Sequence, residues 1–193
     1  IDPKQGMSPT LKATLAEQLA TLGIKPEQIG RIGISHYHFD HTGQAAVFPK
    51  ATLLIGAGDW DVLSKNSAPG QADPDAVAPW TKGGSKVEPV TGDKDIFGDG
   101  SVTMIELPGH TPGHYGLLVR LKETGPVLLT GDVSHFTENY ASDGIPPFNT
   151  DRADSLAALD RFKKIAANLK ATVIIQHEPA DIAKLPAFPK AAH

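Results

Sequence analysis

Residues 31–43 read Arg31-Ile32-Gly33-Ile34-Ser35-His36-Tyr37-His38-Phe39-Asp40-His41-Thr42-Gly43. The apolar residues at the start of this stretch predict a short buried strand over Arg31–Ser35, so the polar cluster lies on the loop that follows it. Imidazole nitrogens and carboxylate oxygens are ligands of zinc and related cations. Three histidines and an aspartate within six positions therefore predict a metal site at the end of a strand.

The remainder of the chain alternates predicted strands and helices, which is typical of the α/β class. A helix opening at Ser8-Pro9 and ending at Gly23 is expected from leucines at helical spacing. Apolar runs predict strands over residues 51–55, 86–90, 102–107, 115–121, 127–130 and 172–175. Helices are expected over residues 44–47, 58–64 and, capped by Thr150 or Asp151, up to Leu169. The proline and glycine content of residues 65–85 predicts a long loop.

Length and composition indicate one globular domain over residues 1–193. The net charge is −4, and the basic residues are scattered, which argues against a nucleic-acid partner. No apolar run approaches the ~20 residues that cross a bilayer, so we expect a soluble protein without a membrane partner. The chain has no cysteine, which leaves cytoplasmic, periplasmic and secreted locations open.

Three more candidate ligands follow predicted strands. They are His110 in Pro108-Gly109-His110, Asp132 in Thr130-Gly131-Asp132, and His177 in Gln176-His177-Glu178. Seven ligands exceed the needs of one tetrahedral zinc, which takes three protein ligands and a water. The expected partition gives one metal His36, His38 and His110, gives the other Asp40, His41 and His177, and makes Asp132 the bridge. Two divalent cations are therefore expected, zinc first, although cobalt, manganese and iron also fit these donors.

The pattern His36-x-His38-x-Asp40-His41, with His110, Asp132 and His177 downstream, resembles the metallo-β-lactamase superfamily. The resemblance implies an αβ/βα sandwich of two mixed sheets flanked by helices, with a dinuclear site at one edge. The context of Phe39 and Thr42-Gly43, and the stretch from Gly131 through Tyr140, resemble its N-acyl homoserine lactonase branch. In this family several strands precede the first helix and end in an Ile-Asp pair, which Ile1-Asp2 resembles. We therefore expect an N-terminally incomplete domain whose open sheet edge is covered by the missing strands, by a partner chain or by a homo-oligomer.

The resemblance implies a hydrolase that opens a lactone or ester, such as an acyl homoserine lactone, by attack of a metal-bridging hydroxide. Such a lactonase is a quorum-quenching enzyme. Asp40 would ligate a metal and also orient the nucleophile or shuttle a proton. Lactonases of this branch usually carry a tyrosine three residues after the bridging aspartate, and His135 stands there. An imidazole can donate a hydrogen bond or act as general acid, which makes His135 the second candidate catalytic residue.

Several alternatives use the same ligands: a β-lactamase, a thioesterase, an organophosphate hydrolase, or a fragment that binds metal without activity. The bridging Asp132 argues against a true β-lactamase, which generally lacks it. His114 has no ligand position left, and we expect it to form a structural hydrogen bond. Five aromatic residues are candidates for an apolar pocket wall, namely Trp60, Trp80, Phe136, Tyr140 and Phe148.

Overall fold

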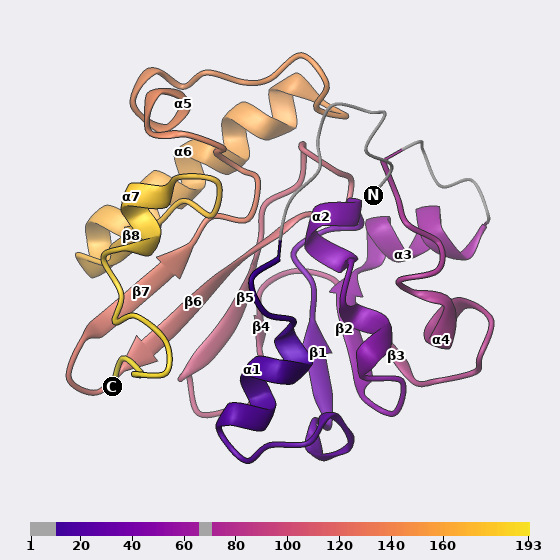
Figure 1. The fold of residues 1–193 in the computed structure, drawn as a ribbon. Coiled ribbons are helices and arrows are strands. Elements are labelled where there is room, and N and C mark those ends of the chain that lie inside the picture. The colour runs from indigo at the N-terminus through magenta and orange to yellow at the C-terminus, as the bar shows by residue number, and fades with distance from the viewer. Residues whose placement is uncertain (1–10, 66–70) are drawn as a thin grey trace.

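The computed structural model describes residues 11–65 and 71–193 and shows two β-sheets packed against each other, with helices on their outer sides (Figure 1). In chain order the first sheet region contains α1 (Leu15–Thr21), η2 (Pro26–Gln28), β1 (Arg31–Gly33), α2 (Phe39–Thr42), η3 (Ala45–Val47), β2 (Thr52–Gly56), α3 (Ala57–Ser64), α4 (Ala78–Thr81) and β3 (Val87–Val90). The second contains β4 (Lys94–Asp95), β5 (Val102–Glu106), β6 (Tyr115–Leu121), β7 (Gly125–Leu129), α5 (Thr137–Ser142), α6 (Arg152–Leu169), β8 (Thr172–Ile174) and α7 (Pro179–Ile182). The predicted α/β sandwich is confirmed.

The first sheet has the strand order β1-β2-β3, and both described pairs are parallel. Parallel neighbours need a crossover connection, which α2 with η3 and then α3 with α4 supply. The described part of this sheet is thus parallel rather than mixed. Its outer strand β1 is the edge at which further strands or a partner chain are expected, and that expectation stays a prediction, as does the extent of the domain. Ile1-Asp2 and Ser8-Pro9 lie outside the described residues.

The second sheet is mixed, as expected. Strands β4 to β7 form an antiparallel meander, and β8 adds to β7 in parallel after the α6 crossover. Because β8 returns beside β7, the residues that follow these two strands emerge at the same edge of the sheet. The chain positions after Leu129 and after Ile174 therefore meet, although they are far apart in the sequence.

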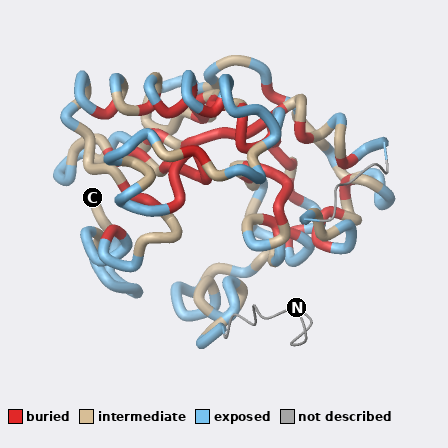
Figure 2. Tube along the Cα trace, turned by 90° about the horizontal axis from the view of Figure 1, so that it is seen from above, coloured by how far each residue is buried: buried red, intermediate tan, exposed pale blue. Residues whose placement is uncertain are grey.

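Three clusters of buried side chains hold the layers together. Leu53 and Ile55 of β2 pack under α3 and α4, while Leu54, which points the other way, packs between the sheets. Leu128 of β7 packs against Phe162 of α6 on the outer face of the second sheet. Figure 2 shows the buried segments gathered along the strands and on one side of the long helix. Strand β2 is thus covered on both of its faces, which keeps its ends in fixed positions.

Two predicted segments differ from the structure. The first helix begins at Leu15, because Thr14 and Glu17 form a capping box, and none of the residues of α1 is buried. The expected loop over residues 65–85 contains α4 in its described part. Trp80 of α4 is buried and donates its indole N–H to the carbonyl of Ala51 over 2.9 Å. Burial of the apolar Trp80 ring in the core favours the helix despite the proline and glycine content of the segment. Within the described ranges, no helix combines the length and apolar character needed to cross a membrane.

The start of helix α6 lies against the loop that carries His110. The Asp151 carboxylate caps the helix by accepting the N–H of Asp154 over 2.8 Å, and the Asp151 N–H donates to the carbonyl of Gly109 over 2.9 Å. The cap therefore serves both the helix and the position of the neighbouring loop.

Replacing Asp151 by alanine should lower the free energy of unfolding by about 1 kcal/mol, because a helix N–H loses its acceptor. Urea unfolding of the variant and of the parent chain measures the difference. Asp160→Ala is the matched control, because Asp160 lies on the same helix and, among the described residues, its carboxylate forms only an exposed ion pair with Lys164. Equal losses in the two variants would argue against the cap.

Candidate metal centre

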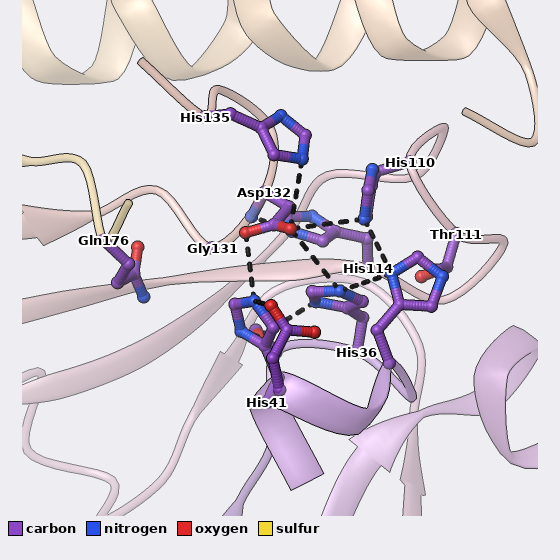
Figure 3. Close-up of polar contacts among 12 residues, drawn as sticks. His36, His41, His110, Thr111, His114, Gly131, Asp132, His135 and Gln176 are labelled. Atoms are coloured by element: carbon purple, nitrogen blue, oxygen red, sulfur yellow. Dashed lines mark hydrogen bonds and ion pairs between the residues drawn. The ribbon is translucent and has the colours of Figure 1, made fainter. Parts of the chain in front are cut away.

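All seven predicted metal ligands come together at one end of the sandwich. The loop after β1 carries His36 and His38, and α2 carries Asp40 and His41. The loops after β5, β7 and β8 carry His110, Asp132 and His177. Close-packed polar side chains from both sheets fill the centre of Figure 3. Sequence positions that span most of the chain are therefore neighbours in space.

The ligands fall into two groups that follow the expected partition. In one group the ligand atoms of His36, His38, His110 and Asp132 lie within 4.8 Å of one another, and all four residues are buried. In the other, those of Asp40, His41 and His177 meet the same limit, and Asp40 is exposed. The centre thus has an enclosed position and one that faces solvent.

The enclosed group converges on the Nδ1 atom of His38. The Nε2 atoms of His36 and His110 each lie 3.0 Å from it. Burial lowers the pKa of all three imidazoles, that of His38 to about 4, so they are neutral at pH 7. Neutral imidazoles offer the lone pairs that a divalent cation binds.

Polar groups behind the ligands fix the orientation of their rings. The Nδ1 atom of His110 lies 3.0 Å from Oδ1 of Asn149. The Ser35 hydroxyl lies 3.1 Å from Nδ1 of both His36 and His41, one ligand of each group. Such partners hold Nδ1 and leave Nε2 to face the centre, the arrangement found around metal-binding histidines.

The solvent-facing group is built around His41 and His177, whose Nε2 atoms lie 3.3 Å apart. Oδ2 of Asp40 is 3.5 Å from Nε2 of His41 and 3.6 Å from Nε2 of His177. Contact with Asp132 raises the pKa of His177, which outweighs the opposite effect of burial. The Asp132 carboxylate of the enclosed group thus also acts on the solvent-facing group.

Asp132 faces both groups. Its Oδ1 lies 3.2 Å from Nε2 of His41 and 3.2 Å from Nε2 of His177, and its Oδ2 lies 3.4 Å from Nε2 of His110. Burial raises the pKa of this carboxyl, but contacts with the imidazoles of His135, His177 and His41 outweigh burial and hold the pKa well below its ordinary value. A charged, buried carboxylate between two groups of ligands is the arrangement expected of a bridging ligand.

His114 supports Asp132 from behind, in agreement with its expected structural role. The Asp132 N–H donates to His114 Nε2 over 2.8 Å, so Nδ1 carries the proton and donates to the carbonyl of Leu107 over 3.0 Å. Burial lowers the pKa of His114 to about 3 and keeps this tautomer uncharged. Gly131 has a φ of 55°, and a Cβ there would overlap the His114 ring. The glycine thus permits the bond.

His135 lies over Asp132, opposite His36 and His41 (Figure 3), with its Nε2 3.2 Å from Asp132 Oδ2. Two half-exposed aromatic rings accompany it. The ring centroid of Phe148 lies 5.5 Å from that of His135 and 5.9 Å from that of His110, and Phe136 lies 6.4 Å from His135. An apolar surface therefore adjoins the polar centre on this side.

The other three candidate pocket aromatics do not reach this surface. Trp80 is part of the core beneath α3 and α4, and Trp60 packs against the same cluster. Tyr140 packs against the core of the second sheet, with its ring 6.2 Å from that of Phe162. The prediction that these three residues line the pocket is wrong, because their rings pack against the cores of the two sheets instead.

The sequence analysis missed Asp59, a fully buried carboxylate near the centre. Asp59 accepts hydrogen bonds from Tyr37 and Thr111, which adjoin predicted ligands, and from Gly113. Burial raises its pKa to about 6, although these donors lower it. An acid in the first turn of a helix is common without any such role, so the sequence carried no signal for it.

The donor set fits a pair of divalent cations. The enclosed group brings the Nε2 atoms of two neutral imidazoles, His36 and His110, each to 3.0 Å from Nδ1 of His38. Oδ1 of Asp132 is buried without a hydrogen bond of good geometry, although two imidazole nitrogens lie near it. Each neutral imidazole carries one N–H and one lone pair, so these nitrogens and the carboxylate oxygens have more lone pairs than N–H groups. Cations between these atoms would bind the remaining lone pairs.

Comparison with known proteins gives the same family. The family model described as the metallo-beta-lactamase superfamily matches residues 6–177. The N-acyl homoserine lactonase AttM of Rhizobium radiobacter is 31% identical over 186 residues, which cover 89% of this chain and 68% of that protein.

Two solved structures share the fold. One is an N-acyl homoserine lactone hydrolase with the product N-hexanoyl-L-homoserine at its catalytic metal centre, which matches with a TM-score of 0.78, 23% identity, and coverage of 91% of this chain and 66% of that chain. The other is AidC, a dizinc quorum-quenching lactonase, with a TM-score of 0.67, 22% identity, and coverage of 88% and 65%. This chain spans about two thirds of the length of these relatives. It belongs to the metallo-β-lactamase superfamily of hydrolases and is related within it to the N-acyl homoserine lactonases.

Proposed function

We propose that this chain is a dinuclear metal-dependent hydrolase that opens a lactone or ester, with an N-acyl homoserine lactone as the first candidate substrate. The observation that carries the proposal is the position of Asp132, whose two carboxylate oxygens face two separate groups of ligands. Two metals that share a bridging ligand are typical of hydrolytic centres. The relationship to N-acyl homoserine lactonases supports the choice of substrate.

The two groups would each hold one cation. His36, His38 and His110 would bind the enclosed one, Asp40, His41 and His177 the other, and Asp132 both. The chemistry that such a pair supplies is a water molecule with a pKa near 7 and polarisation of the substrate carbonyl. Zinc is the first expectation, and the imidazole and carboxylate donors also suit cobalt, manganese and iron.

Asp40 and His135 would handle protons and developing charge. The Asp40 carboxylate reaches solvent, and its Oδ2 lies at the solvent-facing group, where it can accept the proton of the attacking water. His135 presents Nε2 to the centre from the opposite side and can donate a hydrogen bond to the oxygen of the tetrahedral intermediate.

The aromatic rings favour a substrate with an apolar portion. Phe136 and Phe148 are 50% and 55% exposed, although each lies beside an imidazole of the centre. When an apolar chain covers exposed apolar rings at the rim of a polar site, water leaves both surfaces and binding becomes more favourable. An acylated lactone has such a chain next to the bond that is cleaved.

Metal removal tests the proposal. The zinc-loaded chain should hydrolyse N-hexanoyl homoserine lactone, measured as acid release, because the centre then supplies the ionised water. Dialysis against a chelator should abolish the activity, and zinc should restore it. Nitrocefin, a thioester and a phosphotriester measure the rival activities, and faster turnover of one of them would reassign the substrate. If the chain binds two metals but turns over none of these compounds, the proposal that it is a hydrolase is wrong.

Variants of His135 test its role. His135→Phe should lower kcat about 100-fold, because a hydrogen-bond donor to the developing oxyanion is lost. His135→Tyr should lose less, since a phenol can also donate. Metal content should stay at the parent value in both variants, because His135 belongs to neither group of ligands. A parent-like kcat in His135→Phe would remove His135 from the mechanism.

A further inference from the structure

A single buried carboxylate connects the two loops that carry the enclosed histidines. Oδ2 of Asp59 accepts the backbone N–H of Tyr37 over 3.1 Å and the hydroxyl of Thr111 over 2.9 Å. Its Oδ1 accepts the backbone N–H of Gly113 over 2.6 Å. Tyr37 belongs to the first sheet region and the other two donors to the second, so the side chain spans the junction between them.

Two of the three donors are direct neighbours of proposed metal ligands. Tyr37 lies between His36 and His38, and Thr111 follows His110. A shift of either donor therefore moves the backbone of an adjacent ligand. By contrast, the His177 loop has its own anchor, because Asp181 accepts the N–H of Ile175 over 3.0 Å. Asp59 thus holds the loops that carry His36, His38 and His110, while the loop of His177 is held separately.

The backbone around Asp59 leaves little freedom for adjustment. A Cβ at Gly56 would overlap the carbonyl of Gly113, and a Cβ at Gly58 would lie 2.8 Å from the backbone of Pro112. The start of α3 therefore lies directly against the loop that follows His110. With the backbones in contact, the three hydrogen bonds to the Asp59 carboxylate join the start of α3 to both loops.

We propose that Asp59 is a positioning residue that sets the geometry of the metal position formed by His36, His38 and His110. The inference rests on the proposed metal centre but does not depend on which bond the protein hydrolyses. A carboxylate can accept from all three donors, whereas an asparagine must turn its NH2 group toward at least one of them. Asp59→Asn should therefore rotate or shift one of the two loops.

Metal titration of the whole chain measures the effect. Zinc affinities come from competition with a chromophoric chelator, and cobalt absorption reports the geometry of each bound ion. Asp59→Asn should weaken one of the two binding constants about 10- to 100-fold and change its cobalt spectrum, since partners behind the ligands affect affinity to this extent. The other constant should stay at the parent value. His177→Ala shows which constant belongs to which position, because it removes a ligand of the solvent-facing group and leaves the enclosed group intact.

The control is Asp61→Asn, which changes an exposed carboxylate of the same helix that pairs only with Lys65 among the described residues. It should leave both constants and both spectra unchanged. A folded Asp59→Asn with parent-like constants would overturn the positioning role. So would equal weakening of both positions, which indicates general destabilisation.

Circular dichroism of the metal-free variants decides whether they fold. If Asp59→Asn does not, Thr111→Val decides the question, because it removes one donor and keeps the carboxylate. This variant should weaken the same constant by a smaller factor, and an unchanged constant would overturn the proposal. A parent chain that binds no metal refutes the metal centre itself, and a parent chain that binds two metals without hydrolysis refutes only the proposed reaction.

Discussion

The buried carboxylate of Asp132 faces imidazoles from both halves of the sandwich, and much of the surrounding structure serves to keep it there. A buried charge is costly unless charged or polar partners surround it. The partners here come from α2 and from the loops after β5 and β8, while His114 holds the backbone of Asp132 from below. The strand ends of the two sheets must therefore stay close together for the charged Asp132 carboxylate to remain stable.

The same packing prepares the imidazoles for cations. In water a histidine is partly protonated near neutral pH, and a proton competes with a metal for the same lone pair. Burial lowers the pKa of the enclosed histidines and removes that competition, and it also brings their ring nitrogens close to one another. Packing of the two sheets is favourable, and this free energy offsets the cost of bringing the polar side chains of the centre together.

The sequence predicted which polar residues gather at the centre, but not all of the contacts that hold them there. Each ligand follows an apolar run and sits among turn residues, and both signals are local. Asp59 and Trp80 show where such reasoning ends. The helix-start position of Asp59 hides contacts with loops far along the chain, and the proline-rich surroundings of Trp80 hide its place in the core. Both depend on tertiary contacts, which neither composition nor periodicity records.

The spread of the ligands along the chain links metal binding to folding. Within the solvent-facing group, Asp40 and His177 are separated by most of the two sheets, so the position exists only when β1 and β8 have both reached their places. An ion that binds the folded chain but not the unfolded chain adds RT ln(1 + [L]/Kd) to the free energy of unfolding, where [L] is the concentration of the free ion. The melting temperature would then rise with the concentration of free metal, and scarcity of the ion in the cell would shorten the lifetime of the folded chain as well as limit its chemistry.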